Sequence, residues 1–402
     1  MMKKELNTLA ANVARLSNLL TRERETLPFP YLKDKGLREA YILYYLPANM
    51  YKIHVPLREL SLHPAGIFRK ERLRVLDLGS GPGTAILGVM GFFSASAWAD
   101  KPSLEFTAVD PIEENLRDAE KLFQSFKDDT LVGASLLTIK SGIGMMKSLP
   151  KGPFDMIILS NVLSEVFHPV RHPELVSGSQ TMPGQEIPKQ VRDDREAGKT
   201  GRLDYRLNLL KSLINRSLAE DGSCIIIEPA LRATSRELLE VRDGLLREGL
   251  HIYSPCLMND PCPALVNPKD WCHEDIPWMP PDIVREVDKL TGLRKDSLKF
   301  SYLVIRKDSL SLSDIFVNNP FRVVSEPLAS KGKIEYYLCG ADGRRLAVRL
   351  DKDKNNLNEP FSGLKRGWVV RFQRLNAEGK RLKVAKETTV LTFPSPLRER
   401  DG

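Results

Sequence analysis

Residues 75–84, with the sequence VLDLGSGPGT, contain the pattern that decides the fold of this chain. Their first part is a run of apolar residues typical of a buried strand, and the glycines that follow predict a tight turn. Glycine adopts positive φ without steric strain, and its missing side chain lets the backbone approach a ligand closely. We therefore expect a strand, a glycine-rich loop and a helix, the arrangement that opens nucleotide-binding α/β folds.

Similar apolar runs recur downstream, and helical stretches separate several of them. The strand candidates are LEFTAVD (104–110), SLLTIKSG (135–142), FDMIILSN (154–161), GSCIIIEPA (222–230), GLHIYSP (249–255) and FSYLVIRK (300–307). Strands that alternate with helices predict a parallel, doubly wound α/β sheet. After this region, short alternating runs separated by turn signals predict a small antiparallel β module, of the type of an oligonucleotide-binding barrel.

The sequence thus predicts a chain of several parts around one α/β domain. These parts are an N-terminal helical region (1–70), the α/β domain (71–325), a basic β module (326–395) and a tail (396–402). Two segments interrupt the α/β domain. Residues 168–201 are rich in Pro, Gly, Gln and charge, which predicts a disordered surface insertion. Residues 253–281 form a loop crowded with Pro, Cys and Trp.

Composition and charge narrow the class of protein. Hydrophobic residues make up 42% and charged residues 28%, which excludes collagen-like and wholly disordered chains. No apolar run is long enough for a membrane helix, so we expect no membrane contact. The N-terminus lacks the features of a targeting peptide, so we expect a cytoplasmic location. We also expect a monomer.

The net charge of +8 is confined to the end of the chain. Residues 331–402 contain 17 Lys and Arg against 9 Asp and Glu, and the rest of the chain is balanced. A basic module on a neutral body favours a polyanionic partner such as nucleic acid. The alternative is a soluble basic domain with no such partner.

The glycine loop resembles motif I of the Rossmann-like S-adenosylmethionine-dependent methyltransferases. In that family the loop passes under the methionine part of the cofactor. The residues that the resemblance assigns to cofactor binding are Asp77, Gly79, Ser80, Gly81, Gly83 and Thr84. Asp110 ends the next strand, where a carboxylate can accept hydrogen bonds from ribose hydroxyls. The alternative is a loop of the nucleotide-binding type that is kept for structure alone.

The strand at 154–160 leads into the segment where methyltransferases place substrate-facing residues. Asn161 is present, but the Pro-Pro-aromatic run typical of base-amine methyltransferases is missing, which disfavours methylation of a base nitrogen. Asn161 and Glu165 are the weak catalytic candidates, although Glu165 is as easily explained as a helix cap or a partner of a surface lysine.

Four of the five cysteines suggest a metal centre. Cys256, Cys262 and Cys272 have the spacing C-x5-C-x9-C, and Cys339 lies in the β module. A cytosolic chain would not keep them as disulfides, whereas four thiolates suit zinc or an iron–sulfur cluster. The wide spacing favours a cluster over zinc, with His273 as an alternative ligand. One centre bound by both parts of the chain would join the β module to the α/β domain.

Not every cysteine feature points to a metal. Cys224 stands apart on an apolar strand, where a cysteine behaves as a small buried hydrophobe. The Pro-Cys pairs at 255–256 and 261–262 are also typical of RNA cytosine methyltransferases with a cysteine nucleophile. In those enzymes the cysteine follows an earlier strand, which disfavours this function here.

Together these motifs resemble the mitochondrial and bacterial small-ribosomal-subunit assembly family of methyltransferase-like proteins. The matching segments are YLPANMYKIHVPLREL, LDLGSGPGTA, FDMIILSNVLSEV, GSCIIIEP, the PC…PCP…DWCH loop, KFSYLVIRK and LCGADG. Two departures are Ala230, where the family tends to have Gly, and the lack of an aromatic residue after His273. Neither departure affects the four cysteines.

The resemblance implies a class I methyltransferase sheet, S-adenosylmethionine binding, and association with small-subunit ribosomal RNA or a 30S precursor. It also implies a 4Fe–4S cluster held by Cys256, Cys262, Cys272 and Cys339, and a mitochondrial-matrix location for eukaryotic relatives. We expect an assembly factor that uses the fold as an RNA-binding platform, and an active ribosomal RNA methyltransferase is the alternative. Membership by itself does not establish methyl transfer.

Overall fold

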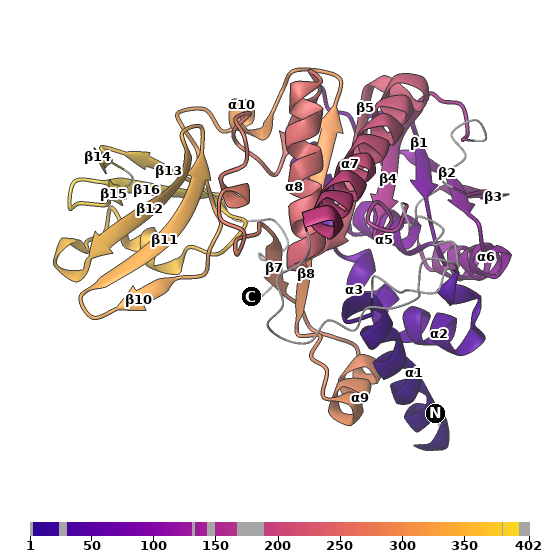
Figure 1. Cartoon of the computed structure of the whole chain (residues 1–402). Coiled ribbons are helices and arrows are strands. Elements are labelled where there is room, and N and C mark those ends of the chain that lie inside the picture. Colours follow the sequence, from indigo (N-terminus) through magenta and orange to yellow (C-terminus); the bar gives the residue numbers. More distant parts are fainter. Residues whose placement is uncertain are drawn as a thin grey trace.

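The computed structural model of the chain consists of two sheets that lie side by side, with helices packed on the first of them (Figure 1). It describes residues 3–23, 30–130, 133–142, 149–166, 189–379 and 381–393. No helix in these ranges combines the length and the apolar character needed to cross a membrane.

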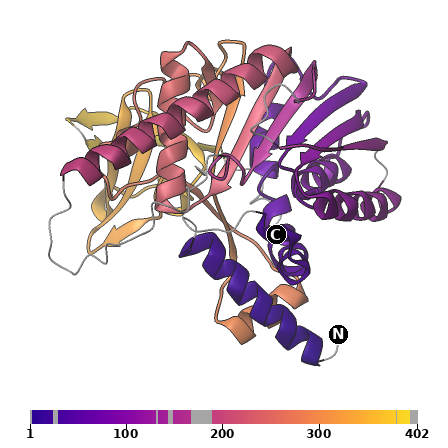
Figure 2. The ribbon, with the colours of Figure 1, turned by 45° about the vertical axis from the view of Figure 1, so that its right-hand side comes forward.

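The N-terminal region is helical, as predicted. Its elements are α1 (Lys3–Thr21), η2 (Tyr31–Lys33), α2 (Lys35–Ala40), the π-helical turn η3 (Tyr41–Tyr45), α3 (Leu46–Met50) and α4 (His54–Ser61). Leu9, Val13 and Leu16 on one face of α1 are buried against a group that includes Val284 and Val287 of α9 (Asp282–Thr291). Figure 2 shows α1 and α9 beside each other, away from the first sheet.

The first sheet has the strand order β3-β2-β1-β4-β5-β8-β6, and β7 pairs with β8 outside this path. The strands are β1 (Arg72–Leu78), β2 (Ser103–Asp110), β3 (Ala134–Lys140), β4 (Phe154–Ser160), β5 (Leu218–Pro229), β6 (His251–Ser254), β7 (Glu274–Pro277) and β8 (Ser297–Arg306). Neighbours from β3 to β5 are parallel, whereas β8 runs antiparallel to both β5 and β6. The Rossmann-like class I methyltransferase sheet expected from the sequence is therefore confirmed.

Helices cover both faces of this sheet. They are α5 (Thr84–Ala95), α6 (Glu113–Asp128), α7 (Lys189–Ser217) and α8 (Arg232–Arg247). Apolar side chains of α4, α5 and α6 share one hydrophobic core with the strands, and those of α7 and α8 share the other. The central strands β1, β4 and β5 lie between these two cores and are mostly buried on both sides, which explains their continuous hydrophobic runs.

The structure describes only the last part of the expected insertion. Residues 168–188 lie outside the described residues, whereas residues 189–201 form the first part of α7, which begins at Lys189. This stretch is polar but contains many good helix formers, such as Lys, Gln, Arg, Glu and Ala. It continues the helix that the apolar residues after 202 anchor on the sheet.

The second sheet has the order β14-β15-β12-β11-β9-β13-β16, and β10 pairs with β11. Its strands are β9 (Phe321–Val323), β10 (Leu328–Ser330), β11 (Lys333–Gly340), β12 (Gly343–Leu350), β13 (Val369–Gln373), β14 (Asn376–Glu378), β15 (Arg381–Lys383) and β16 (Thr389–Phe393). The pairs are antiparallel except β12 with β15, which is parallel and was not expected. The short helix α10 (Leu312–Ile315) precedes β9, so this sheet starts before residue 326.

A buried polar network joins the two sheets. Arg322 of β9 forms a 2.6 Å ion pair with Glu59 of α4, and Tyr302 of β8 donates a 2.6 Å hydrogen bond to the other oxygen of the same carboxylate. All three side chains are buried, and Arg322 also donates to the carbonyl of Gly367. The sequence gives no local signal for this contact, because its members are far apart in the chain.

Candidate functional site

The glycine loop lies between β1 and α5, at the carboxyl edge of the parallel strands. Gly79, Gly81 and Gly83 have φ values of 69°, 52° and 81°, which is the left-handed region that favours glycine. The backbone amides of Gly79 and Ser80 both donate to the carbonyl of Val109, which fixes the loop beside β2. A Cβ added to Gly81 would meet no atom within 4 Å, so the backbone there borders open space where a ligand can approach.

Asp77 is the orphaned polar group of this loop. It is 1% exposed, and neither of its carboxylate oxygens has a hydrogen-bond partner among the described residues. Burial, and secondarily the charge of Asp110, raises the pKa of Asp77 to about 8. A buried carboxylate without partners is costly unless a cationic ligand compensates it. The site therefore suits a ligand that brings a positive group to Asp77.

Asp110 ends β2 on the other side of the loop. Its Oδ2 accepts a 2.9 Å hydrogen bond from the Gly81 amide, and its Oδ1 accepts from the Ile112 amide and the Asn115 side chain. Burial raises its pKa, although these hydrogen bonds oppose the shift. A carboxylate has about four acceptor positions, so Asp110 holds the loop and retains room for about one further donor. This is less than the two ribose hydroxyls that the sequence suggested.

The N-terminal helices contact the loop from outside the sheet. The Thr84 hydroxyl at the start of α5 donates to the Tyr41 hydroxyl at 3.3 Å, and Asn49 donates to the same oxygen at 3.5 Å. Burial raises the pKa of Tyr41, which therefore stays neutral. The π-helical turn η3 thus forms one wall beside the predicted cofactor residues, a role that the sequence did not indicate.

The weak catalytic candidates follow β4. Asn161 adopts φ 60°, and its amide donates to the carbonyl of Ile227, which holds the segment against β5. Glu165 accepts from the Tyr31 hydroxyl at 3.5 Å, so it does contact the N-terminal wall. The better buried carboxylate at this edge is Glu228 of β5, which accepts from the Ser164 amide and hydroxyl.

The structure brings the four candidate cysteines together from three segments. Cys256 and Cys262 lie after β6, Cys272 lies before β7, and Cys339 lies near the end of β11. All four are free thiols. Burial is the main cause that raises the pKa of Cys272, followed by the charges of the other three cysteines, so all four lie within electrostatic reach of one another.

Two arginines of α8 hold the cysteine loop. Arg242 is fully buried and donates to the carbonyls of Met258 and Asp260. Arg236 donates to four carbonyls of the stretch from Ala264 to Asp270. Burial would lower the pKa of Arg242, but Cys256, then Asp243, outweigh it and raise the pKa. Helix α8 therefore supplies both the fold of the loop and a positive charge beside its sulfur atoms.

The β module contacts the cysteine loop directly. The Sγ atom of Cys339 lies 3.7 Å from the Sδ atom of Met258, and Arg344 of β12 pairs with Asp270. In the part of the chain that the structure describes, no group of three or more His, Cys, Asp or Glu side chains is arranged to hold a single metal ion. His273 stacks on Trp271, with ring centroids 5.7 Å apart.

Comparison with known proteins adds a family to this geometry. The sequence model of the family described as "Mitochondrial small ribosomal subunit Rsm22" matches residues 203–387. This range contains all four candidate cysteines and most of the second sheet, but not the glycine loop. No curated protein matches the chain.

Solved methyltransferase structures are weakly similar. The plantazolicin methyltransferase BpumL in complex with SAH is 10% identical, with a TM-score of 0.35 over 76% of this chain and 99% of that chain. Loganic acid methyltransferase with SAH is 12% identical, with a TM-score of 0.37 over 68% of this chain and 95% of that chain. A SAM-dependent methyltransferase from Methanosarcina mazei is 11% identical, with a TM-score of 0.32 over 62% and 98%.

The fold assignment rests on the strand order and the glycine loop, because these likenesses are weak. The family match rests on a different part of the chain, from α7 to the second sheet. Residues 203–387 therefore carry the sequence pattern of the mitochondrial small ribosomal subunit Rsm22 family, and the family resemblance inferred from the motifs is confirmed over that range.

Proposed function

We propose that this chain is an assembly factor of the small ribosomal subunit that binds ribosomal RNA through a methyltransferase-like fold. The observation that carries the proposal is the place of the family match. It covers the cysteine loop and the basic β module, the two features that a generic methyltransferase does not need. The family description names the small ribosomal subunit, which makes ribosomal RNA the natural polyanion for the basic module.

Exposed basic side chains of the β module form the proposed RNA surface. Several basic residues of the module are not available, since Arg349 is buried and Arg344 is ion-paired. The exposed set, here called the basic surface, is Lys331, Lys352, Lys365, Arg374, Arg381, Lys383 and Lys386. Contacts of this kind release counterions from RNA, so binding is expected to weaken steeply as salt rises.

S-adenosylmethionine is the proposed ligand of the glycine loop. The open space at Gly81, the orphaned carboxylate of Asp77 and the remaining acceptor position of Asp110 fit its amino acid part and its ribose. When bound, the cofactor supplies a transferable methyl group. The residues of this chain would hold and orient it: Asp77 would compensate the charge of the cationic amino group, and the absence of a side chain at Gly81 would let the ligand approach the backbone.

A 4Fe–4S cluster is the proposed occupant of the cysteine site, with zinc as the alternative. Each iron of such a cluster takes one cysteine, so the four thiolates lie farther apart than around a single zinc ion. After burial, the charges of the other three cysteines raise the pKa of Cys272, which supports a site shared by the four thiols. Arg242 would offset part of the negative charge of the thiolates. The cluster would join Cys339 of the β module to the loop on the α/β domain.

The alternative function is an active ribosomal RNA methyltransferase. It is favoured by polar groups near the glycine loop and at the carboxyl edge of the sheet, such as Tyr41 beside the loop and Glu228 at the end of β5. Loss of a specific ribosomal RNA methyl group in a deletion strain would decide for this alternative.

The test of the proposed function is the identity of the RNA that crosslinks to the full-length protein in cells. Small-subunit ribosomal RNA is the expected product, and it should be lost from a variant in which Arg374, Arg381 and Lys386 are changed to Gln. Enrichment of other RNA classes, or no RNA at moderate salt, would refute the proposal. Size-exclusion chromatography with light scattering tests the monomeric state that we propose.

Anaerobic purification tests the metal. The cluster predicts a brown protein whose visible absorbance bleaches on reduction, with about four irons per chain. Cys224→Ala is the matched control, because Cys224 is fully buried in β5 and lies outside the site. A colourless protein with stoichiometric zinc would establish the zinc alternative.

A further inference from the structure

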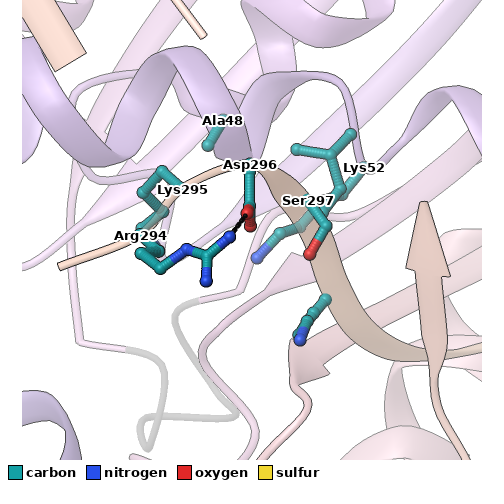
Figure 3. A pocket seen from close by; sticks show the side chains of 8 residues that line it. Ala48, Lys52, Arg294, Lys295, Asp296 and Ser297 are labelled. Atoms are coloured by element: carbon teal, nitrogen blue, oxygen red, sulfur yellow. Dashed lines mark hydrogen bonds and ion pairs between the residues drawn. The ribbon is translucent and has the colours of Figure 1, made fainter. Parts of the chain in front are cut away.

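A basic cavity lies at the carboxyl edge of the first sheet, apart from the glycine loop and the cysteines. It has a volume of about 400 Å³ and is lined by the end of the N-terminal helical region and by the start of β8. Its charged lining residues include Lys52, Arg294, Lys295 and Asp296, which Figure 3 labels. Lys299 is a further lining residue. Neither the glycine loop nor the basic surface explains this concentration of positive charge.

Lys52 is the most unusual of these residues. Its side chain is 7% exposed, and no hydrogen bond or ion pair joins its ammonium group to another described residue. Burial, and then the charge of Lys295, lowers the pKa of Lys52 to about 7, while Glu228 opposes the shift. Glu228 is already engaged by Ser164. A buried lysine without a carboxylate partner is unfavourable in the free protein.

Lys295 lines the same cavity. Its ammonium lies over the rings of Tyr45, at 4.7 Å from the centroid, and Tyr44, at 5.9 Å. Asp288 is the nearest acid, but it accepts hydrogen bonds from the Tyr44 hydroxyl and from the backbone amide of Lys295. The two lysines therefore repel each other across a cavity that contains no carboxylate paired with either.

The charges at the mouth are compensated in part. Arg294 pairs with Asp296 at 2.8 Å, and Lys299 pairs with Asp275 at 3.3 Å. Both pairs are solvent-exposed and therefore weak, so each cation can turn toward an incoming anion at little cost. Neither Lys52 nor Lys295 is paired in this way with a carboxylate of a described residue, and Lys295 contacts the faces of two tyrosine rings instead.

An exposed aromatic side chain lies next to this cavity. Tyr51 precedes Lys52 and is 42% exposed, and its ring centroid lies 6.1 Å from that of Trp278. The indole of Trp278 donates to the backbone carbonyl of Lys295. Single-stranded RNA is commonly bound by aromatic side chains that stack on its bases while cations hold its phosphates. This combination favours a nucleotide over an isolated inorganic anion.

We propose that the cavity between Lys52 and Lys295 binds a phosphate group, and that this phosphate belongs to the backbone of a single-stranded RNA segment whose base stacks on Tyr51. The proposal rests on the proposed function, because it gives the RNA a second contact far from the basic surface. It places that segment beside Glu228, at the edge of the sheet where methyltransferases hold their substrates.

The first experiment tests the anion site without RNA. Inorganic phosphate is titrated into the full-length wild type and into Lys52→Met and Lys295→Met, with thermal melting and calorimetry as readouts. Phosphate should raise the melting temperature of the wild type and of the control Lys289→Met, which removes an exposed charge of α9 outside the cavity. It should have no such effect on the two cavity variants. Equal responses of all four proteins would overturn the proposal.

The second experiment identifies the source of the phosphate. Binding of short polyuridine and of small-subunit ribosomal RNA is measured against salt concentration. Lys52→Met should weaken binding about tenfold, as expected for one charge-assisted contact, and lower the salt slope by roughly one. Tyr51→Ala should weaken binding without changing the slope.

The outcomes of these experiments separate the two proposals. Phosphate binding with unchanged RNA affinity in Lys52→Met would assign the cavity to a free phosphate and overturn the RNA part. RNA binding that depends on the basic surface alone, with no phosphate effect, would overturn this inference and leave the proposed function intact. Loss of all RNA binding from the wild type would refute the proposed function, while phosphate protection would still establish the anion site.

Discussion

Removal of the Arg322 guanidinium should loosen the β module from the α/β domain. In the wild type, Arg322 and Glu59 form a 2.6 Å ion pair in which both side chains are at least nine-tenths buried. The network also includes Tyr302, the carbonyl of Gly367 and the buried Glu274 carboxylate, which lies 3.8 Å from Arg322. Arg322→Met keeps much of the side-chain volume but leaves the Glu59 carboxylate with one hydrogen bond, from Tyr302. The variant therefore tests what an uncompensated buried charge does to this junction.

The expected magnitude follows from the burial of the pair. Breaking a buried ion pair by removing one partner destabilises a protein by about 3–5 kcal/mol, and the remaining Tyr302 bond places this case near 3 kcal/mol. Removing the charge of Glu59 as well, with Glu59→Gln and Arg322→Met together, should restore up to about 2 kcal/mol of that loss, because the Glu59 charge is then no longer buried without Arg322. The restoration is partial, since the buried Glu274 carboxylate still loses its 3.8 Å pair with Arg322. The exposed pair of Lys354 and Glu359 supplies a control, since Lys354→Met should change stability by less than about 1 kcal/mol.

Equilibrium unfolding in urea, followed by circular dichroism, measures these differences. Limited proteolysis of the segment before β9 adds a local readout, because a loosened module exposes its connection to the α/β domain. A single variant that stays within about 1 kcal/mol of the wild type would refute the reasoning. So would a double variant that loses the sum of the two single losses, because the two residues would then not be coupled.

Three further predictions concern the candidate sites. Asp77→Asn should lower the affinity for S-adenosylmethionine about tenfold, the effect of one charge-assisted contact. Because the pKa of Asp77 is raised to about 8, binding of the cationic ligand by the wild type should release a proton near pH 7, and calorimetry in two buffers should show no release in the variant. Cys339→Ser should lower the iron content and the melting temperature of anaerobically purified protein, and an unchanged melting temperature would contradict a cluster that joins the two sheets. Lys52→Met should stabilise the protein at pH 7 by up to about 5 kcal/mol, because folding lowers the pKa of Lys52 from 10.5 to about 7. Burial and the charge of Lys295 lower this pKa, whereas Glu228 opposes the shift. Between pH 7 and pH 10.5 the unfolded wild type binds more protons than the folded wild type, so the stability of the wild type rises with pH in this range. The stability advantage of Lys52→Met should therefore vanish towards pH 10. A stability difference that does not change with pH would refute the buried charge of Lys52 as its cause.

The sequence by itself determined the elements whose signals are local. The apolar runs and the glycines at 79, 81 and 83 predict the strand, loop and helix that the structure contains, because strand burial and positive φ are properties of neighbouring residues. The spacing of Cys256, Cys262 and Cys272 with the distant Cys339 indicated that these thiols meet, and the structure places them within electrostatic reach. The basic end of the chain likewise follows from counting charges.

The tertiary structure decided the contacts that join distant parts of the chain. Glu59 with Arg322, and Lys52 with Lys295, have no sequence pattern in common, and only the packing of the N-terminal helices on β8 and β9 brings them together. Residues 189–201 are helical because the helix anchored after residue 202 extends through polar residues with good helix propensity, which outweighed a composition typical of disorder. Patterns of neighbouring residues in the sequence therefore predicted the helices, the strands and the loops that contain the motifs. The electrostatic character of the sites, including the orphaned Asp77 and the two cavity lysines, depends on which charges the fold buries together and which it leaves without a partner.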